Sequence, residues 1–463
     1  MKINPNIFKA YDIRGIYPSE INGKVAYLIG RAFVQFLARK KPNVVVGRDN
    51  RLSSKSLAKN LIKGILYQGG NVIDIGLSTS PMLDFAVAHF NFDGGIEITA
   101  SHNPPEYNGF KLLRERAISI GQGIGLGKIK KLVIKGKFLK KKKGNFFKKV
   151  VLTDYLNFNF NFFETSKFKP LKIVIDTGNA TAGILIPYLR KKIPGKIFPL
   201  FENLDGNFPN HIPDPSKIEN LNFLKKEIIK KRANLGVAFD GDGDRVVFLN
   251  EKGEIIPGDL IAALISRLLL KEKPGEKILY DIRSSKIVEE VIKKNGGIPV
   301  MNRVGHSFIK ERMRKENILF GGEYSGHYYL RDQYFFEVPI FVFLKVLEII
   351  SKTEKKISQL VKPFQKYFHS GEINFQLENR KGILKKLEKK YQNGKILKID
   401  GLRVDFPNWW FLARLSQTEP VLRLSIEAKT KKLMAEKKKE LSSLITRAKR
   451  SVEMKAKPSS TKG

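Results

Sequence analysis

Short apolar runs alternate with segments of helical period along most of the chain. In three places an apolar run enters a polar turn and is followed by apolar residues spaced three and four positions apart. The runs lie at residues 44–46, 172–175 and 278–280. The helices are expected near residues 57–66, 180–189 and 287–292. Apolar strands that alternate with helices are typical of α/β layers, and we expect each unit to build its own sheet.

The repeat of apolar run, polar turn and helical segment ends near Pro363. Beyond it come charged helical stretches and short strands such as residues 422–427, with no further copy of the repeat. At about 100–200 residues per domain, a chain of 463 residues has room for three or four domains. We therefore expect three similar α/β domains and a fourth of different architecture, with boundaries at 1–150, 151–253, 254–363 and 364–463.

Two polar segments and the C-terminal tail are predicted to lie outside the packed units. The lysine-rich residues 140–145 and the turn at 250–253 are interpreted as connections between repeats. Residues 455–463 are almost entirely Lys, Pro, Ser, Thr and Gly, which bury too little surface to become ordered, so we expect a frayed end.

Composition narrows the classes of protein to consider. Apolar residues make up 42% and charged residues 28%, which is a globular composition and excludes a wholly disordered or collagen-like chain. Because the chain has no cysteine, disulfides, thiolate metal sites and cysteine nucleophiles are excluded. No apolar run approaches the roughly 18 residues that span a bilayer, and residues 1–15 lack the order of a signal peptide. We expect a soluble, cytoplasmic protein.

The net charge is unusually high. Lysines and arginines total 85 and aspartates and glutamates 45, which gives +40. A basic surface would suit nucleic acid or anionic lipid, and it would also speed the capture of anionic substrates. However, the lysines are scattered through the whole chain, and basic runs such as 140–143 are short and not interleaved with aromatic residues. We therefore expect no specific nucleic-acid partner and no membrane partner.

The first candidate site follows the strand-like run at 95–98. Residues 99–105 form a proline-stiffened loop that presents Ser101. A hydroxyl is a poor nucleophile until another group accepts its proton or stabilises its product, and His102 and Lys111 are candidates for that role. An ordinary serine-containing loop is the other interpretation, but two consecutive prolines fix the backbone where no regular element needs fixing.

A second candidate site is formed by aspartates at alternate positions. Asp240, Asp242 and Asp244 come directly after the apolar run 235–239. Three such carboxylates repel one another unless a hard cation lies among them, so the spacing favours a Mg²⁺ or Ca²⁺ site over a solvated acidic turn. An EF-hand does not fit, because Arg245 stands where that loop needs glycine and a strand-like run follows.

Two further loops carry weaker signals. Residues 321–327 combine close-packing glycines with Glu323 and Ser325, an acceptor and a donor of the kind that sugar hydroxyls need. Residues 414–420, with Arg423 beyond them, offer two arginines, two hydroxyls and backbone N–H groups that would suit a phosphate. Either loop alone is also typical of an exposed polar turn. No nucleotide-binding glycine motif is present.

Taken together and in this order, the four loops resemble the α-D-phosphohexomutase superfamily, and in particular its phosphomannomutase/phosphoglucomutase branch. The resemblance covers nearly the whole chain and includes the opening Phe8-Lys9-Ala10-Tyr11-Asp12-Ile13-Arg14-Gly15 and the segment Val304-Gly305-His306-Ser307-Phe308-Ile309-Lys310. It implies four domains around a central cleft. The first three would share one α/β topology, and the last would be an α+β domain like the TATA-binding protein.

The resemblance also implies roles for individual residues. Ser101 would be carried as a phosphoserine. Mg²⁺ would be held by one phosphoserine oxygen and by Asp240, Asp242 and Asp244. The groups implied around the reacting phosphate are Arg14, His102, Lys111 and Arg245, with His102 or Lys111 handling the hydroxyl proton. The substrate-binding residues implied are Tyr11, Arg283, His306, Glu323, Ser325, His327, Arg414, Ser416, Thr418 and Arg423.

The implied reaction interconverts hexose 1-phosphate and hexose 6-phosphate through a hexose 1,6-bisphosphate. Glucose or mannose 1,6-bisphosphate would serve as activator. Because glucose and mannose differ only at the 2-hydroxyl, recognition through the 3- and 4-hydroxyls predicts activity on both. The alternatives are a phosphoglucosamine mutase, an inactive relative that only binds sugar phosphate, and a nucleic-acid-binding protein. Monomer and dimer both stay open.

Three departures from the family pattern fall near the expected cleft. Gln417 stands where the family has Asn or Gly, Arg283 replaces a lysine, and residues 336–339 replace a stretch of acidic and small residues. We expect these changes to affect substrate preference rather than reaction type.

Overall fold

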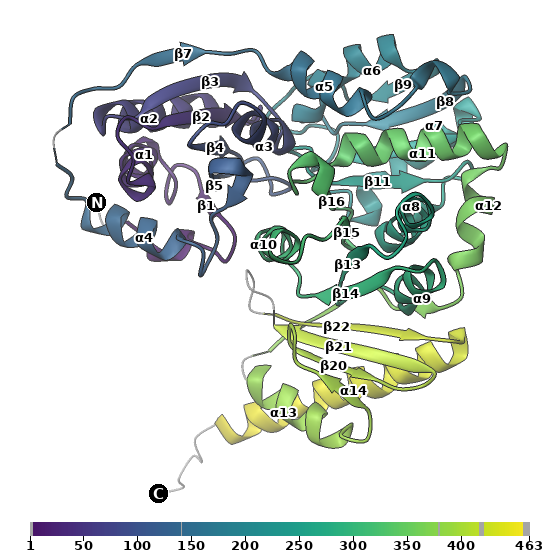
Figure 1. The fold of residues 1–463 in the computed structure, drawn as a ribbon. Helices are drawn as coiled ribbons and strands as arrows, with labels where there is room; N and C mark the ends of the chain where they lie inside the picture. Colours follow the sequence, from purple (N-terminus) through teal and green to yellow (C-terminus); the bar gives the residue numbers. More distant parts are fainter. Residues whose placement is uncertain (1–2, 140, 378–379, 416–420, 457–463) are drawn as a thin grey trace, which may run out of the picture.

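Each of the three predicted repeats forms a sheet of its own, and the fourth unit forms a sheet of another kind (Figure 1). The computed structural model describes residues 3–139, 141–377, 380–415 and 421–456, with side chains up to residue 447. Within these residues no helix is both long and apolar enough to cross a bilayer. The three α/β domains and the separate C-terminal architecture are confirmed.

The first sheet has seven strands in the order β1-β5-β4-β2-β3-β7, with β6 beside β5. Its central strands β2, β3 and β4 are parallel and rich in buried apolar residues, as expected for strands covered on both faces. The strands are β1 (Ile13–Ile16), β2 (Asn43–Arg48), β3 (Asn71–Leu77), β4 (Gly94–Ile98), β5 (Tyr107–Arg114), β6 (Ile118–Ser119) and β7 (Phe146–Lys148). The helices are α1 (Gly23–Leu37), α2 (Ser54–Tyr67), α3 (Ser80–His89) and α4 (Leu126–Lys135).

The second sheet has the order β12-β11-β10-β8-β9. Its elements are α5 (Leu152–Phe160), β8 (Leu171–Asp176), α6 (Ile186–Lys192), β9 (Gly195–Leu200), α7 (Asn222–Lys231), β10 (Leu235–Phe239), β11 (Val246–Leu249) and β12 (Ile255–Ile256). The helix expected over 180–189 begins instead as a 3₁₀ segment, Thr181–Leu185, and becomes α-helical only at Ile186. The turn at 250–253 joins β11 to β12 inside this sheet.

The third sheet has the order β14-β13-β15-β16. Its elements are α8 (Gly258–Glu272), β13 (Lys277–Asp281), α9 (Lys286–Lys294), β14 (Ile298–Asn302), α10 (His306–Glu316), β15 (Phe320–Gly322), β16 (Tyr328–Leu330), α11 (Pro339–Thr353) and α12 (Ile357–Val361). Helix α11 is apolar on nearly all sides and is buried accordingly.

The fourth sheet is antiparallel in the order β17-β22-β21-β20-β19, with β18 beside β22. Its elements are β17 (Phe368–His369), β18 (Ile373–Gln376), α13 (Arg380–Lys390), β19 (Lys395–Leu397), β20 (Leu402–Asp405), β21 (Trp409–Leu415), β22 (Val421–Ala428) and α14 (Lys431–Ala456). Helix α14 includes the first two residues of the predicted frayed tail. Residues 457–463 lie outside the described residues.

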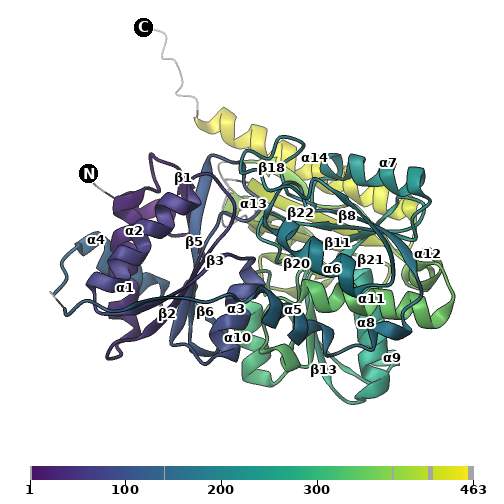
Figure 2. The same ribbon diagram turned by 90° about the horizontal axis from the view of Figure 1, so that it is seen from above.

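One hydrophobic cluster extends through all of the first three domains. Helices α3, α5 and α11, one from each of these domains, pack together, and Figures 1 and 2 both show α3 beside α5. Aromatic rings join them, with centroids 5.2 Å apart both for Phe85 and Phe158 and for Phe163 and Phe341. The fourth domain has its own core between its sheet and its helices. The first three domains therefore form one packed body, and the fourth is attached to it.

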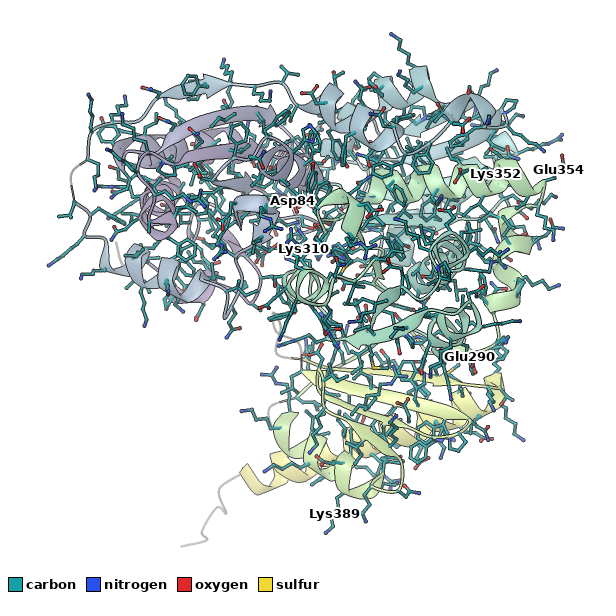
Figure 3. All side chains as sticks on the ribbon, in the orientation of Figure 1. Asp84, Glu290, Lys310, Lys352, Glu354 and Lys389 are labelled. Carbon is teal, nitrogen blue, oxygen red and sulfur yellow. The ribbon has the colours of Figure 1, made fainter. Side chains whose placement is uncertain are left out.

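A buried ion cluster also ties the first domain to the third. The Lys310 Nζ on α10 lies 2.6 Å from Asp84 Oδ2 on α3 and 2.5 Å from Glu337 Oε2, which precedes α11. Figure 3 shows Asp84 and Lys310 pointing toward each other where the two domains meet. All three side chains are buried, and burial raises the pKa of Glu337 to about 7. The positive charge of Lys310 balances both buried carboxylates, and without it neither would keep this partner.

We expect Lys310→Met to lower the free energy of unfolding by about 3–5 kcal/mol, because it leaves two buried carboxylates without their cation. Urea denaturation measures the change. The matched control is Lys352→Met, which breaks the surface pair of Lys352 with Glu348 and should cost no more than about 1 kcal/mol. Equal, small losses in the two variants would contradict a stabilising role for the buried cluster.

Candidate active site

Ser101 and Asp240 meet although 139 residues separate them. Each follows the carboxyl end of a strand, Ser101 after β4 and Asp240 after β10, and the Ser101 Oγ donates a hydrogen bond of 2.9 Å to Asp240 Oδ2. Ser101 is buried and has a φ of +51°, a left-handed backbone that non-glycine residues rarely adopt. Strain of this kind is typical of functional loops, and here it accompanies the presentation of the hydroxyl.

The contact between the two loops requires a glycine. A Cβ at Gly241 would lie 2.2 Å from the Ser101 carbonyl oxygen, so no side chain fits between the serine loop and the aspartate loop. Neither the serine motif nor the aspartate motif indicates by itself that they approach this closely.

His102 and Arg14 lie beside the serine. The Ser101 Oγ is 3.1 Å from His102 Nδ1, and Arg14 reaches the loop through a 2.6 Å bond to Asn103 Oδ1. Burial, followed by the positive charges of Arg245 and Arg14, lowers the pKa of His102 well below its ordinary value. His102 is therefore neutral near pH 7 and able to accept a proton.

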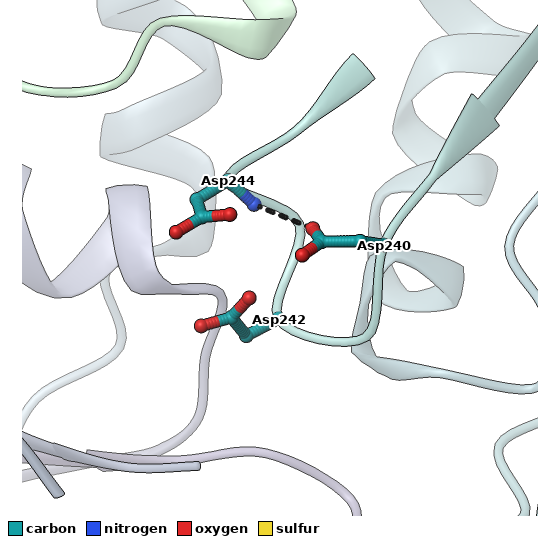
Figure 4. Close-up of side chains that lie close together, drawn as sticks. All are labelled: Asp240, Asp242 and Asp244. Atoms are coloured by element: carbon teal, nitrogen blue, oxygen red, sulfur yellow. Dashed lines mark hydrogen bonds between the residues drawn. The ribbon is translucent and has the colours of Figure 1, made fainter. Parts of the chain in front are cut away.

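The three aspartate side chains converge as their spacing predicts (Figure 4). All three are buried, and one oxygen of each lies within 4.8 Å of the others. Asp240 Oδ1 accepts hydrogen bonds from the backbone N–H groups of Asp244 and Arg245, both at 3.1 Å. Burial, and then the charges of Asp244 and Asp242, raise the pKa of Asp240 well above its usual range.

The carboxylates fit a hard divalent cation. Among the described residues, Asp242 Oδ1 is buried and has no hydrogen-bond partner. An all-carboxylate donor set suits Mg²⁺ or Ca²⁺ rather than a soft metal. An unpaired oxygen inside a cluster of three negative charges is what such a cation would satisfy.

Two basic side chains offset part of this negative charge. The Lys111 Nζ lies 2.5 Å from Asp242 Oδ2 and 2.6 Å from Asp244 Oδ2. Burial opposes the charge on Lys111, but the two carboxylates outweigh it and hold the pKa of the lysine well above its ordinary value. Arg245 contributes a second cation, with its Nε 3.8 Å from Asp240 Oδ2.

The glycine-rich loop of the third domain joins the aspartate loop through His327. The His327 Nε2 is 3.2 Å from Asp244 Oδ1 and 3.3 Å from the Arg245 Nε, and its Nδ1 is 3.1 Å from the Ser325 Oγ. Arg283 Nη2 lies 3.3 Å from Glu323 Oε2 and 3.4 Å from the Ser325 Oγ. The loop predicted from Glu323 and Ser325 thus lies at the same site.

Tyr11 and His306 form the edge of the site between the first and third domains. Their ring centroids are 5.7 Å apart, and the Tyr11 hydroxyl donates to the Val304 carbonyl oxygen at 3.3 Å. Burial, followed by the charges of Lys310 and Lys111, lowers the pKa of His306 well below its ordinary value.

The arginines of the fourth domain gather around Glu372. Arg414 Nη2 donates to Glu372 Oε1 at 2.9 Å, while Arg423 Nη1 and Arg283 Nη1 lie 3.9 and 3.8 Å from Glu372 Oε2. Burial favours the neutral acid, but the charges of Arg283 and Arg414 outweigh it and lower the pKa of Glu372 to about 2. Ser416, Gln417 and Thr418 lie outside the described residues.

Sequence reasoning missed three residues at the site. Glu372 lies in no motif that we singled out. Ser80 donates a 2.6 Å hydrogen bond from its Oγ to Asp242 Oδ2, and Arg51 bonds to the backbone of the serine loop. The one available signal was their place in the chain. Arg51 comes shortly after β2 and Ser80 shortly after β3, at the same edge of the sheet as the serine loop that follows β4.

We expect Mg²⁺ to raise the melting temperature of the protein, because the cation relieves the repulsion among the three carboxylates. At a concentration about 100 times the dissociation constant, a bound ion stabilises the fold by about 2.7 kcal/mol. Differential scanning fluorimetry measures the shift. Asp242→Ala should abolish it, whereas Asp332→Asn, at a surface pair with Lys273, should keep it. An unchanged Mg²⁺ shift in Asp242→Ala would contradict the metal site.

Family models match all four domains. Those for phosphoglucomutase/phosphomannomutase alpha/beta/alpha domains I, II and III match residues 5–140, 151–253 and 257–367. The model for the phosphoglucomutase/phosphomannomutase C-terminal domain matches residues 372–443.

Individual relatives agree with the family models. The chain is 40% identical to a phosphomannomutase of Vibrio cholerae over 452 residues, which is 95% of this chain and 98% of the relative. It is 36% identical to a phosphomannomutase/phosphoglucomutase of Pseudomonas aeruginosa, with 92% of each chain covered. A crystal structure of a phosphoglucomutase/phosphomannomutase family protein from Burkholderia thailandensis superimposes with a TM-score of 0.88 at 33% identity, covering 96% of this chain and 98% of the other. This protein therefore belongs to the phosphoglucomutase/phosphomannomutase family.

Proposed function

We propose that the protein interconverts hexose 1-phosphates and hexose 6-phosphates of mannose and glucose through a phosphoserine at Ser101. The observation that carries the proposal is the 2.9 Å contact of the Ser101 Oγ with Asp240, one of three converging aspartates. A hydroxyl held against a predicted Mg²⁺ site is suited to carrying a phosphoryl group. The names of the relatives, which include both phosphomannomutase and phosphomannomutase/phosphoglucomutase, support the same substrates.

In this proposal Asp240, Asp242 and Asp244, together with one phosphoserine oxygen, hold Mg²⁺. The ion would neutralise the negative charge of the phosphoryl group. Lys111, Arg14 and Arg245 surround the same space and add fixed positive charge, which favours a transition state whose charge is spread over the phosphoryl oxygens.

The phosphoryl group passes from Ser101 to a free hydroxyl of the bound hexose phosphate. The bond from phosphorus to the serine oxygen breaks, a bond to the sugar oxygen forms, and one proton must move from the sugar hydroxyl to the serine oxygen that is released. We assign its acceptance to His102 rather than Lys111, because His102 is neutral and Lys111 is held as an ammonium ion. The resulting 1,6-bisphosphate turns over and returns its other phosphate to Ser101.

The remaining residues hold the sugar in either orientation. Glu323 and Ser325 would bind the 3- and 4-hydroxyls, and Arg414 and Arg423, with Ser416 and Thr418, would bind the non-reacting phosphate. Arg283, His306, His327 and Tyr11 would line the sugar site. Free glucose or mannose 1,6-bisphosphate would activate the enzyme by loading Ser101.

A coupled assay with Mg²⁺ and a trace of glucose 1,6-bisphosphate tests the proposal on glucose 1-phosphate and mannose 1-phosphate separately. We expect turnover of both substrates and none in Ser101→Ala, because alanine carries no phosphoryl acceptor. Ser266→Ala is the matched control, since this buried serine donates to the Ala262 carbonyl oxygen of its own helix α8. Turnover of glucosamine phosphate alone would instead indicate a phosphoglucosamine mutase, and full activity in Ser101→Ala would refute the phosphoserine.

We expect Gly241→Ala to reduce kcat by about 100-fold. The added methyl group must push the serine and aspartate loops apart by up to about 1 Å, which misplaces the reacting groups. The same coupled assay measures it. Gly127→Ala is the control, because a Cβ at Gly127 in α4 would meet nothing within 4 Å. Wild-type kcat in Gly241→Ala would show that the close approach of the two loops is not needed.

A further inference from the structure

Arg51, a buried arginine that was not among the predicted site residues, is hydrogen-bonded to the backbone of the serine loop. Arg51 follows β2, which lies beside β4 in parallel register with Arg48 opposite Ile98. Its side chain has no exposed surface, and the ring of Phe208 from the second domain covers it, with the guanidinium carbon 5.1 Å from the ring centroid. A guanidinium buried this deeply must have all its donors satisfied.

All five N–H groups of this guanidinium are used. Arg51 Nε donates to Asp49 Oδ2 at 3.1 Å. Nη2 donates to the carbonyl oxygens of Ser101 and Asn103 at 2.8 and 2.6 Å. Nη1 donates to those of Pro104 and Tyr107 at 2.6 and 3.1 Å. One planar group therefore fixes four carbonyl oxygens between Ser101 and Tyr107.

The Ser101 carbonyl is the point where this hydrogen bonding meets the aspartate loop. It accepts from Arg51 on one side, and on the other it lies where a Cβ at Gly241 would come within 2.2 Å. A shift of this carbonyl would therefore move Ser101 against Gly241 and change the distance from the Ser101 Oγ to Asp240. A left-handed backbone at a non-glycine residue such as Ser101 persists only when its surroundings hold it, and these hydrogen bonds do so.

The segment that carries Arg51 is itself tied to the second domain. Asn50 Nδ2 donates to the Asn179 carbonyl oxygen at 2.8 Å, and the Asn50 N–H donates to Thr181 Oγ1 at 3.2 Å. A Cβ at Gly206 would lie 2.7 Å from both the Asn50 carbonyl oxygen and the Leu52 nitrogen. Arg51 is thus positioned against the same domain that supplies the aspartates.

We propose that Arg51 is a positioning residue for phosphoryl transfer, which sets the distance between the Ser101 Oγ and the aspartate cluster by fixing four backbone carbonyls. The inference rests on the proposed function, because it assumes that Ser101 is the phosphoryl carrier. Arg51 would act through the backbone of the serine loop, not by touching substrate or metal. Lysine keeps the charge but offers its donors from a single nitrogen, so it does not reproduce the fork that reaches four oxygens.

The test compares Arg51→Lys with Arg314→Lys. Arg314 is a matched control because its Nη2 also donates to three backbone carbonyls, of Arg116, Ala117 and Tyr334, away from the serine loop. Three properties are measured for each full-length variant: melting temperature, the kcat and KM of the coupled assay, and hydrogen exchange of the backbone over residues 99–107. Mass spectrometry also follows the rate at which glucose 1,6-bisphosphate loads Ser101.

We expect Arg51→Lys to lower kcat and the loading rate by about 100-fold with KM within about 3-fold of wild type, the pattern of a misplaced reacting group. Exchange over 99–107 should become faster in this variant only. Arg314→Lys should keep kcat within about 3-fold of wild type, even if its melting temperature falls as far as that of Arg51→Lys. Equal loss of kcat in the two variants, or unchanged exchange of the serine loop, would overturn the proposal.

Failure of the proposed function gives a different result. If Ser101 does not carry phosphate, the wild-type protein shows no loading and no turnover, whereas the exchange measurement still reports whether Arg51 holds the loop. If Arg51→Lys is too unstable to purify, Phe208→Leu removes the covering ring while leaving every hydrogen bond of Arg51 in place. It should then show a smaller loss of kcat with faster exchange over 99–107, and wild-type values of both would refute the proposal.

Discussion

Three buried carboxylates lie within 4.8 Å of one another in the aspartate loop, and the arrangement of the site follows from the need to offset their repulsion. Lys111 comes from the first domain and Arg245 from the aspartate loop itself, while His327 reaches Asp244 from the third domain. The His327 contact brings the glycine-rich loop to the cluster, and the Lys111 contact brings strand β5 to it. The charge that demands a cation therefore assembles the groups that would act on a phosphoryl group.

The proposed phosphoryl-transfer residues and the proposed phosphate-binding arginines lie on parts of the protein that have separate hydrophobic cores. The serine, the aspartates and the glycine-rich loop lie on the first three domains, which are joined by a common hydrophobic cluster and by the buried ion cluster around Lys310. The arginines at 414 and 423 belong to the fourth domain, which has a core of its own. Glu372 holds these arginines toward Arg283 of the third domain, so a phosphate bound there, as proposed, would compete with a carboxylate already in contact with them.

Much of the fold could be predicted because its signals are local. The strand before Asp240 is a continuous apolar run, and the strand before Ser101 is interrupted only by Glu97. The helices near 57–66 and 287–292 have clear periodicity, whereas periodicity alone did not show that Thr181–Leu185 would be 3₁₀. Arg51, Glu372 and Lys310 had no such signal. Their partners lie 50, 42 and 226 positions away in the chain. Folding within the first and fourth domains brings Arg51 to Ser101 and Glu372 to Arg414, and the packing of the third domain on the first brings Lys310 to Asp84. The domain boundaries and the roles of the individual site residues, Ser416 and Thr418 among them, stay predictions.

The central claim, that Ser101 gives up its own phosphoryl group and takes another, is tested most directly by a single-turnover experiment. Enzyme carrying an isotopically labelled phosphoserine is mixed with unlabelled mannose 1-phosphate, and the products are separated. We expect the label to leave the protein and appear at the 6-position of the sugar product, while Ser101 becomes phosphorylated with unlabelled phosphate. Unlabelled mannose 6-phosphate formed while the label stays on the protein would contradict it.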